Sequence, residues 1–207
     1  GGLVAGQCVL LAGEPGIGKS TLLLAAAHAY AIGGRKPRTV LYVSGEESSE
    51  QISIRARRIG ADAATLLVAD ETDLAVLLGH VEDSDPDLLV VDSVQTIASS
   101  DLDGRAGGVA QVHEVTQVLT RAAKGRRMPL LMIGQSTRDN SVAGPRALEH
   151  LVDTVLTFEG DRETPLRLLR ATKNRYGPAD EVACFEQVAE GLREVTDPST
   201  LFRSHRD

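Results

Sequence analysis

The chain has 207 residues, of which 42% are hydrophobic and 25% are charged, as in an ordinary globular domain with a core of its own. Its formal net charge of −7 argues against nucleic-acid binding over the whole surface and leaves room only for a local basic groove. The two cysteines, Cys8 and Cys184, exclude a disulfide scaffold and a structural zinc site. Without an apolar run of about 18 residues or a secretory signal, the sequence predicts a cytoplasmic protein that contacts no membrane.

Along the first two thirds of the chain, short apolar runs alternate with segments of helical periodicity. The apolar runs predict strands at residues 7–12, 39–44, 66–68, 88–91 and 129–134. The periodic segments predict helices at residues 21–31, from a capping box at Ser48 and Gln51 onward, at 73–81 and at 109–123. Such alternation is typical of a parallel sheet with helices on its faces.

The last third of the chain has a different pattern. Residues 152–158, 166–172 and 182–188 predict consecutive strands without long helices between them. We therefore predict an α/β fold, with a mainly parallel central sheet flanked by helices and an antiparallel C-terminal extension. Two polar, glycine-containing stretches, residues 101–108 and 137–145, are predicted loops after the fourth and fifth parallel strands.

A phosphate-binding motif follows the first predicted strand. Residues 13–20 (GEPGIGKS) match the pattern G-x-x-x-x-G-K-S/T, with a strand before it and a helix after it. Glycines let the backbone turn its N–H groups toward a phosphate, the lysine reaches the β- and γ-phosphates, and the serine hydroxyl can ligate Mg²⁺. The motif predicts binding of ATP with Mg²⁺ by Gly13, Glu14, Pro15, Gly16, Ile17, Gly18, Lys19, Ser20 and Thr21.

Two acidic residues are predicted to complete this site. Asp92 ends the apolar strand 88–91 at the edge where ligands bind in open α/β sheets, so it is the second predicted Mg²⁺ ligand after Ser20. Ser93 follows it where many nucleotide hydrolases carry a glutamate, so the residue that positions water must lie elsewhere. Glu46, just after the second strand, is predicted to be this catalytic residue. Glu47 is interpreted as a charge favoured near a helix N-terminus.

Three segments carry a resemblance to a known family. Residues 90–94 (VVDSV), together with Glu46, resemble the core of bacterial RecA. Residues 143–161 (AGPRALEHLVDTVLTFEGD) and 173–177 (KNRYG) resemble the bacterial RadA (Sms) family of DNA repair proteins. The second of these is similar to the family's K-N-R-F-G signature, with Tyr176 in place of phenylalanine. The resemblance extends over residues 1–195.

The resemblance implies a RecA-like P-loop NTPase domain over residues 1–195. It further implies a DNA-stimulated ATP hydrolase, assembled as a homo-hexameric ring, that acts on single-stranded and branched DNA. Its role would be to process or branch-migrate recombination intermediates, with the RecA recombinase as a candidate partner. The family carries a four-cysteine zinc segment before this core and a Lon-protease-like domain after it. We therefore expect an ATPase core, with residues 196–207 as a tail or linker toward the latter domain.

The resemblance also assigns roles to residues late in the chain. Gln135 corresponds to a glutamine that senses the γ-phosphate in RecA. Lys173 and Arg175 would enter the site of a neighbouring subunit and stabilise the charge that develops on the γ-phosphoryl group. Their spacing by two on an extended segment places both on one face. The alternative reading is a solvated basic edge that prevents strand pairing.

DNA contacts are predicted in the two polar loops, which face the central channel in rings of the RecA type. Arg105, Arg138 and Arg146 are the predicted DNA-binding residues. The chain has three Tyr, three Phe and no Trp, so contacts to the DNA backbone are favoured over base stacking. Two other functions use the same phosphate loop, a P-loop kinase and a nucleotide-dependent switch of the KaiC type. The first needs an arginine-rich lid, which is not visible, and the second lacks the 173–177 signature.

Overall fold

The structure is a computed structural model that describes residues 2–136, 144–160 and 164–196. Its centre is a nine-stranded sheet with the strand order β3-β2-β4-β5-β1-β6-β7-β8-β9. The strands are β1 (Cys8–Gly13), β2 (Val40–Ser44), β3 (Leu66–Asp70), β4 (Leu88–Asp92), β5 (Leu130–Gln135), β6 (Thr154–Gly160), β7 (Leu166–Asn174), β8 (Val182–Val188) and β9 (Gly191–Glu194). The helices are α1 (Lys19–Ile32), α2 (Ser49–Arg58), α3 (Leu74–Ser84), α4 (Val109–Arg126) and α5 (Pro145–Leu148), with 3₁₀ turns η1 (Val94–Thr96) and η2 (Glu149–Leu151).

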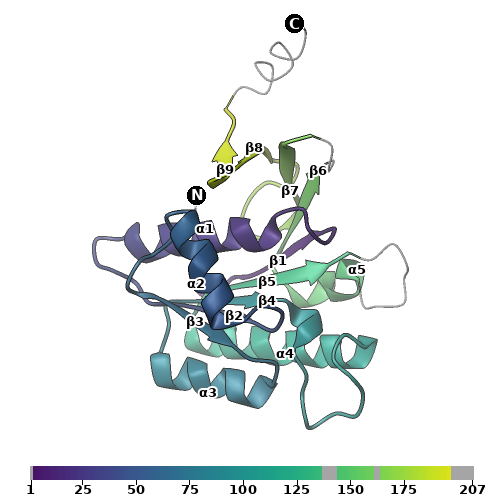
Figure 1. The fold of residues 1–207 in the computed structure, drawn as a ribbon. Coiled ribbons are helices and arrows are strands. Elements are labelled where there is room, and N and C mark those ends of the chain that lie inside the picture. The colour runs from purple at the N-terminus through teal and green to yellow at the C-terminus, as the bar shows by residue number, and fades with distance from the viewer. Residues whose placement is uncertain (1, 137–143, 161–163, 197–207) are drawn as a thin grey trace, which may run out of the picture.

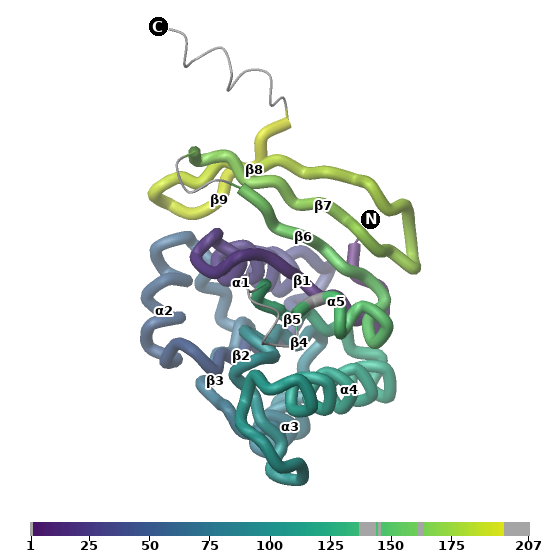
Figure 2. Tube along the Cα trace, turned by 90° about the vertical axis from the view of Figure 1, so that its right-hand side faces the viewer, coloured from purple at the N-terminus to yellow at the C-terminus, as the bar shows by residue number. Residues whose placement is uncertain are grey.

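The sheet divides into a parallel part and an antiparallel part, as predicted. Strands β3, β2, β4, β5, β1 and β6 pair in parallel, whereas β6, β7, β8 and β9 pair antiparallel. Figure 1 shows the parallel strands between the helices, and Figure 2 shows β6–β9 rising above them toward the C-terminus. The predicted fold class is therefore confirmed.

Two hydrophobic cores lie on opposite faces of the parallel strands. Leu10 of β1 belongs to the core under α3 and α4, whereas its neighbours Val9 and Leu11 belong to the core under α1 and α2. Successive residues of β4 alternate in the same way between the two cores, and Leu88 to Val91 are fully buried. Because side chains alternate across a strand, a continuous apolar run fills both cores at once.

The local signals in the sequence explain where several elements begin and end. Helix α2 begins at the predicted capping box, in which the Ser48 hydroxyl accepts from Gln51 N at 3.2 Å and the Gln51 side chain accepts from Ser48 N at 3.0 Å.

Strand β9 was missed, because its four residues pair only with β8 and show no apolar alternation. Among the described residues, no helix is both long and apolar enough to cross a membrane.

The two faces of α3 give a direct test of this packing. Leu77 is fully buried under the sheet, whereas the adjacent Val76 is 47% exposed. We expect Leu77→Ala to lower the free energy of unfolding by about 2–5 kcal/mol, because it opens a cavity in the core. Val76→Ala, the matched control, should change it by less than about 1 kcal/mol. Denaturant unfolding measures both values, and equal losses would contradict the assigned packing.

Candidate active site

The phosphate-binding loop joins the end of β1 to the start of α1. Gly16 and Gly18 have φ values of 78° and 108°, a backbone conformation that favours glycine. Gly13 is needed for a different reason, because a Cβ at this position would lie 2.5 Å from the carbonyl oxygen of Phe158 in β6. The loop therefore wraps closely against the sheet, and the N-terminus of the 14-residue helix α1 faces it. This is the usual geometry of a phosphate site.

A buried arginine from the antiparallel strands also holds the loop. Arg167 of β7 is 4% exposed, and its Nε donates to the carbonyl oxygen of Ile17 at 3.1 Å. Its other nitrogens donate to the carbonyls of Thr164 and Leu166 and, at 2.6 Å, to Gln187 Oε1 of β8. No motif in the sequence marks Arg167, since it is a single arginine within a strand.

Lys19 supplies a buried positive charge to the loop. Its side chain is 6% exposed, and its ammonium donates to the carbonyl oxygens of Gly13 at 2.8 Å and Glu14 at 2.6 Å. Burial lowers the pKa of Lys19, and the charges of Asp92, Glu46 and Glu14 act against this shift. A cation in poorly solvated surroundings is weakly screened, and it therefore attracts phosphate strongly.

Asp92 lies at the carboxyl end of β4, where the sequence placed it. It is 6% exposed, and the hydroxyl of Tyr42 donates to its Oδ2 at 2.8 Å. Tyr42 pairs in register with Val90, so its ring lies on the face of the sheet that carries Asp92. Burial and the nearby Asp92 charge raise the pKa of Tyr42, so this hydroxyl remains a donor. The one signal in the sequence that marks Tyr42 is its polar atom inside an apolar strand.

Glu46 sits in a turn that the structure fixes from both sides. Gly45 N donates to the carbonyl oxygen of Asp92 at 2.9 Å, and Glu46 N donates to Ser44 Oγ at 3.2 Å. A Cβ at Gly45 would lie 2.2 Å from Thr96 Oγ1, so only glycine allows this approach. The turn is thereby held against the end of β4, next to the predicted Mg²⁺ ligand.

The carboxylate of Glu46 brings together two predicted site residues, Glu46 itself and Gln135, and also contacts Ser93. Its Oε1 accepts hydrogen bonds from Ser93 Oγ at 3.3 Å and from Gln135 Nε2. Burial and then the charge of Asp92 raise the pKa of Glu46, while the Ser93 hydrogen bond and Lys19 act against this shift. A carboxyl group with a raised pKa, held near a phosphate loop, is suited to accept a proton.

Glu47 has a different environment from Glu46. Its carboxylate forms an ion pair with Arg55 on α2. The Glu47 side chain therefore pairs with the last turn of α2, and of the two glutamates Glu46 is the one that hydrogen-bonds to Ser93 and Gln135. That Glu46 rather than Glu47 is the catalytic residue stays a prediction.

Gln135 ends β5 and is oriented by a second glutamine. Gln95 Oε1 accepts from Gln135 N at 3.2 Å, and Gln95 Nε2 donates to the carbonyl oxygen of Gln135 at 3.3 Å. This leaves the Gln135 side chain directed at Glu46. No motif in the sequence marks Gln95, which lies three residues after Asp92 at the end of β4.

Lys173 and Arg175 lie at the opposite edge of the sheet from the phosphate loop. Lys173 pairs with Val155 of β6, and Arg175 N donates to the carbonyl oxygen of Asp153, whose own N–H donates to Cys8 at the start of β1. The loop begins at the other end of β1, five residues away, which is about 16 Å along the strand. The structure therefore does not bring these two cations to the site of their own chain.

The predicted DNA-binding residues are only partly described. Arg105 is exposed in the segment between η1 and α4, and Arg146 is exposed in α5. Arg138 lies outside the described residues, as do residues 197–207 of the predicted tail. Arg105 belongs to the connection that follows β4, and Arg146 belongs to the connection between β5 and β6.

The residues of the site fit ATP with Mg²⁺. Lys19 and the N-terminus of α1 offer positive charge to phosphate, and Ser20 and Asp92 offer oxygen ligands near it. Among the described residues, no group of three or more His, Cys, Asp and Glu side chains could hold a metal ion by itself. Mg²⁺ is usually held by one or two protein oxygens together with phosphates, so this donor set suits it.

Comparisons with known proteins show which family and which relatives this chain resembles. A family model described as an AAA domain matches residues 1–141. The DNA repair protein RadA of Mycobacterium tuberculosis (strain ATCC 25618 / H37Rv) is 50% identical over 208 residues, which cover 100% of this chain and 43% of that protein. The DNA repair protein RadA of Aquifex aeolicus (strain VF5) is 50% identical over 206 residues, which cover 100% of this chain and 46% of that protein.

A solved structure shows the same fold at low sequence identity. The KaiC-like protein from the hyperthermophilic archaeon Pyrococcus horikoshii OT3 superimposes with a TM-score of 0.74 and 20% identity, over 94% of this chain and 92% of that one. The chain spans less than half the length of the two RadA relatives. It belongs to the AAA domain family, and its similarity to the bacterial RadA DNA repair proteins is confirmed over its whole length.

Proposed function

We propose that this chain is the ATPase core of a DNA-stimulated motor that acts in recombinational DNA repair. The observation that supports hydrolysis best is the convergence of Ser93 and Gln135 on the Glu46 carboxylate, whose pKa is raised by burial and by Asp92. Lys19 and Asp92 act electrostatically on one another at the same edge of the sheet. The similarity to RadA relatives, which extends over the whole of this chain, supports the repair role.

In this proposal each side chain has one task. Lys19 and the N-terminus of α1 bind the phosphates, while Ser20 and Asp92 hold Mg²⁺, which supplies charge neutralisation at the β- and γ-phosphates. Glu46 orients a water molecule and accepts its proton as the water attacks. Gln135, held by Gln95, links Glu46 to the position of the γ-phosphate. Tyr42 keeps the Asp92 carboxylate in place.

Hydrolysis is proposed to be completed across a subunit boundary in a homo-hexameric ring. Lys173 and Arg175 lie at the far end of β1 from their own phosphate loop, so another subunit is the natural target of their charge. Arg175 is the stronger candidate, because its side chain is 57% exposed. Lys173 donates to the carbonyl oxygens of Glu149 at 2.6 Å and Val152 at 2.9 Å, which holds its ammonium against the segment that precedes β6.

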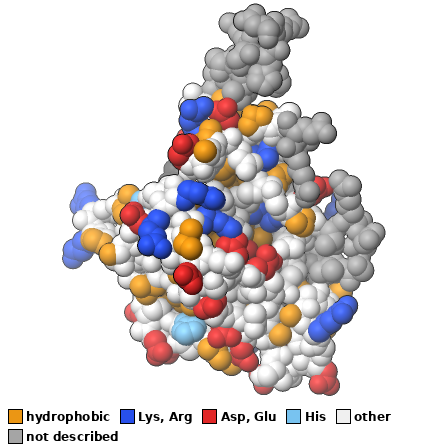
Figure 3. Space-filling view, in the orientation of Figure 1, with side chains coloured by type: hydrophobic (Ala, Val, Ile, Leu, Met, Phe, Trp, Pro, Cys, Tyr) orange, Lys and Arg blue, Asp and Glu red, His pale blue; other side chains and the backbone are white. Residues whose placement is uncertain are grey.

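DNA is proposed to bind through Arg105, Arg138 and Arg146, with single-stranded and branched DNA as substrates and RecA as a candidate partner. In Figure 3 the Lys and Arg side chains gather at the level of α1 and α2, while Asp and Glu side chains dominate the lower part around α3. Arg105 and Arg146 come from other elements, the segment before α4 and helix α5 respectively, so DNA contacts are proposed there and not on this basic area.

We further propose that residues 1–195 form the ATPase domain and that residues 196–207 lead toward a Lon-protease-like domain, in a cytoplasmic protein. The alternative to a DNA motor is a nucleotide-dependent switch of the KaiC type, with which the chain shares its fold. ATP hydrolysis measured with and without single-stranded DNA separates the two, since only the motor is stimulated by DNA.

The role of Glu46 predicts a specific pattern of activity. We expect Glu46→Gln to keep ATP binding and to lower kcat by about 10²-fold or more, because the amide cannot accept a proton. In the parent, kcat should fall as pH drops through the pKa of Glu46, and this fall should occur at a higher pH than for an ordinary glutamate, because that pKa is raised. Steady-state hydrolysis across pH measures both effects.

Glu47→Gln is the matched control for Glu46→Gln. It removes the carboxylate next in sequence, which pairs with Arg55 rather than with the site. It should retain most of the parental kcat and shift the pH profile only slightly downward, because Glu47 makes the smallest of the contributions that raise the pKa of Glu46. If Glu46→Gln kept the parental kcat and Glu47→Gln were inactive, the catalytic role would belong to Glu47.

The trans role predicts complementation between inactive subunits. Arg175→Ala should bind ATP almost normally and hydrolyse it about 10³-fold more slowly, since the positive charge that stabilises the transition state is lost. Lys19→Ala should be inactive, because its own site cannot bind the phosphates. Mixed assemblies of the two should regain activity, because some interfaces combine an intact loop with an intact arginine. Proven mixed assemblies that remain inactive would contradict the trans role.

The DNA proposal predicts a dependence on salt. Replacing Arg105, Arg138 and Arg146 together by Ala should weaken DNA binding similarly for all sequences and reduce the slope of log affinity against log salt by about three. Arg35→Ala, an exposed arginine between α1 and β2, is the control and should leave the slope unchanged. Fluorescence anisotropy at several salt concentrations measures this, and affinity that ignores salt would exclude contacts to the DNA backbone.

A further inference from the structure

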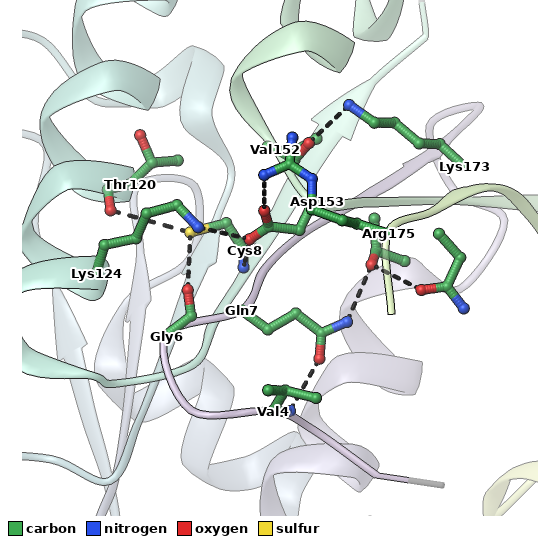
Figure 4. A network of polar contacts seen from close by, with 12 residues as sticks. Val4, Gly6, Gln7, Cys8, Thr120, Lys124, Val152, Asp153, Lys173 and Arg175 are labelled. Carbon is green, nitrogen blue, oxygen red and sulfur yellow. Dashed lines mark hydrogen bonds and ion pairs between the residues drawn. The ribbon is translucent and has the colours of Figure 1, made fainter. Parts of the chain in front are cut away.

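Asp153 is a buried carboxylate that holds three elements together at the amino edge of the sheet. Its side chain is 1% exposed and lies just before β6. Oδ2 accepts from Cys8 N of β1 at 2.9 Å and from Lys124 Nζ of α4 at 2.8 Å. Oδ1 accepts from Arg175 Nη1, just beyond β7, at 2.8 Å. Figure 4 shows the carboxylate between these partners.

The two cations of this cluster are much more exposed than the carboxylate. Lys124 is 47% exposed and Arg175 is 57% exposed. Burial raises the pKa of Asp153, but the hydrogen bonds from Lys124 and Cys8 and the charges of Lys124 and Arg175 outweigh it and lower that pKa. Asp153 therefore stays ionised at neutral pH, and two cations around one anion leave one unit of positive charge facing outward.

Arg175 is tied to Asp153 twice. Its backbone N–H donates to the carbonyl oxygen of Asp153 at 3.0 Å, and its guanidinium donates to the carboxylate of the same residue. The carboxylate itself cannot turn easily, because its other oxygen is held by a backbone N–H and an ammonium. A guanidinium is planar and carries five N–H donors in a fixed fork, so fixing one edge of it also orients the opposite edge.

We propose that Asp153 is a positioning residue that fixes the outward direction of the Arg175 guanidinium, so that this edge meets a phosphate of the neighbouring subunit. The inference rests on the proposed trans role of Arg175. A long side chain without this anchor would have to lose its rotational freedom each time it entered the neighbouring site. Lys124 keeps the cluster positive, so the anchor does not repel the incoming phosphates.

A purely structural role for Asp153 makes a different prediction. Asp153 also joins β6 to β1, because its N–H donates to the carbonyl oxygen of Cys8 and its carboxylate accepts from Cys8 N. Loss of this join alone would destabilise the chain without a specific effect on a neighbouring site. A suitable control is Gln7→Leu. It removes the buried hydrogen bond of 2.9 Å from Gln7 Nε2, just before β1, to Thr154 Oγ1 of β6, and it leaves Arg175 unchanged.

The test compares Asp153→Asn with Gln7→Leu in the assembled protein, by ATP binding, steady-state hydrolysis and thermal unfolding. We expect Asp153→Asn to bind ATP within about twofold of the parent and to lower kcat by about tenfold or more, because small displacements of a catalytic group are costly. Gln7→Leu should lose stability and keep its kcat. Parental kcat in folded Asp153→Asn, or an equal loss of kcat in Gln7→Leu, would overturn the inference.

Mixed assemblies show through which residue Asp153 acts. Asp153→Asn mixed with Lys19→Ala should regain activity, because the latter subunit supplies a correctly held Arg175. Asp153→Asn mixed with Arg175→Ala should not regain it, because neither subunit supplies one. Recovery in the second mixture, or none in the first, overturns the positioning role. The trans proposal fails separately, if Arg175→Ala itself is active or is not complemented by Lys19→Ala.

A second variant covers the case in which Asp153→Asn does not fold. Asp153→Glu keeps the negative charge for Lys124 and Arg175 and displaces the carboxylate by one methylene. We expect it to retain ATP binding and to lose kcat, with the same pattern in mixed assemblies. Parental hydrolysis by Asp153→Glu would overturn the inference.

Discussion

In a parallel sheet the carboxyl ends of all strands lie along one edge, and the candidate site depends on this register. Ser44 pairs with Asp92, and Gly13 pairs with Gln135. These pairs place four features at nearly the same level of the sheet: the turn that bears Glu46, the predicted Mg²⁺ ligand Asp92, Gln135 and the start of the phosphate loop. The register is held by the two cores, because a shift of one residue would exchange the side chains between them. The apolar residues of β1 and β4 thus determine where the polar residues after them can meet.

Electrostatics then joins these strand ends into one site. The Asp92 carboxylate influences the titration of Lys19, Tyr42 and Glu46, which come from three different elements. Burial shifts all three pKa values toward the uncharged form of each group. A site that already lacks water around its charged groups needs less reorganisation when phosphates and a metal ion arrive.

The parts of the site that follow motifs could be predicted from the sequence, and the parts that depend on tertiary contact could not. The phosphate loop, Asp92 and Glu46 were found because each stands at a fixed offset from an apolar run. Tyr42 and Gln95 were missed, because their role comes from strand order, which places β2 and β5 on either side of β4.

The same limit applies to the fold. The parallel and antiparallel parts were predicted from the presence or absence of helices between strands. Strand β9 is only four residues long and owes its conformation to pairing with β8, so no local pattern marks it. Asp153 was likewise read only as part of a family segment, since nothing in the sequence shows that Cys8, Lys124 and Arg175 surround it.

The buried Arg167 has a mechanical consequence. One side chain holds the carbonyl oxygen of Ile17 in the phosphate loop and the side chain of Gln187 in β8, so the loop and the outer strands share a rigid linkage. A displacement of β7 or β8 would therefore be transmitted through Arg167 to the peptide group of Ile17. The antiparallel strands thus help to set the shape of the phosphate loop, in addition to enlarging the sheet.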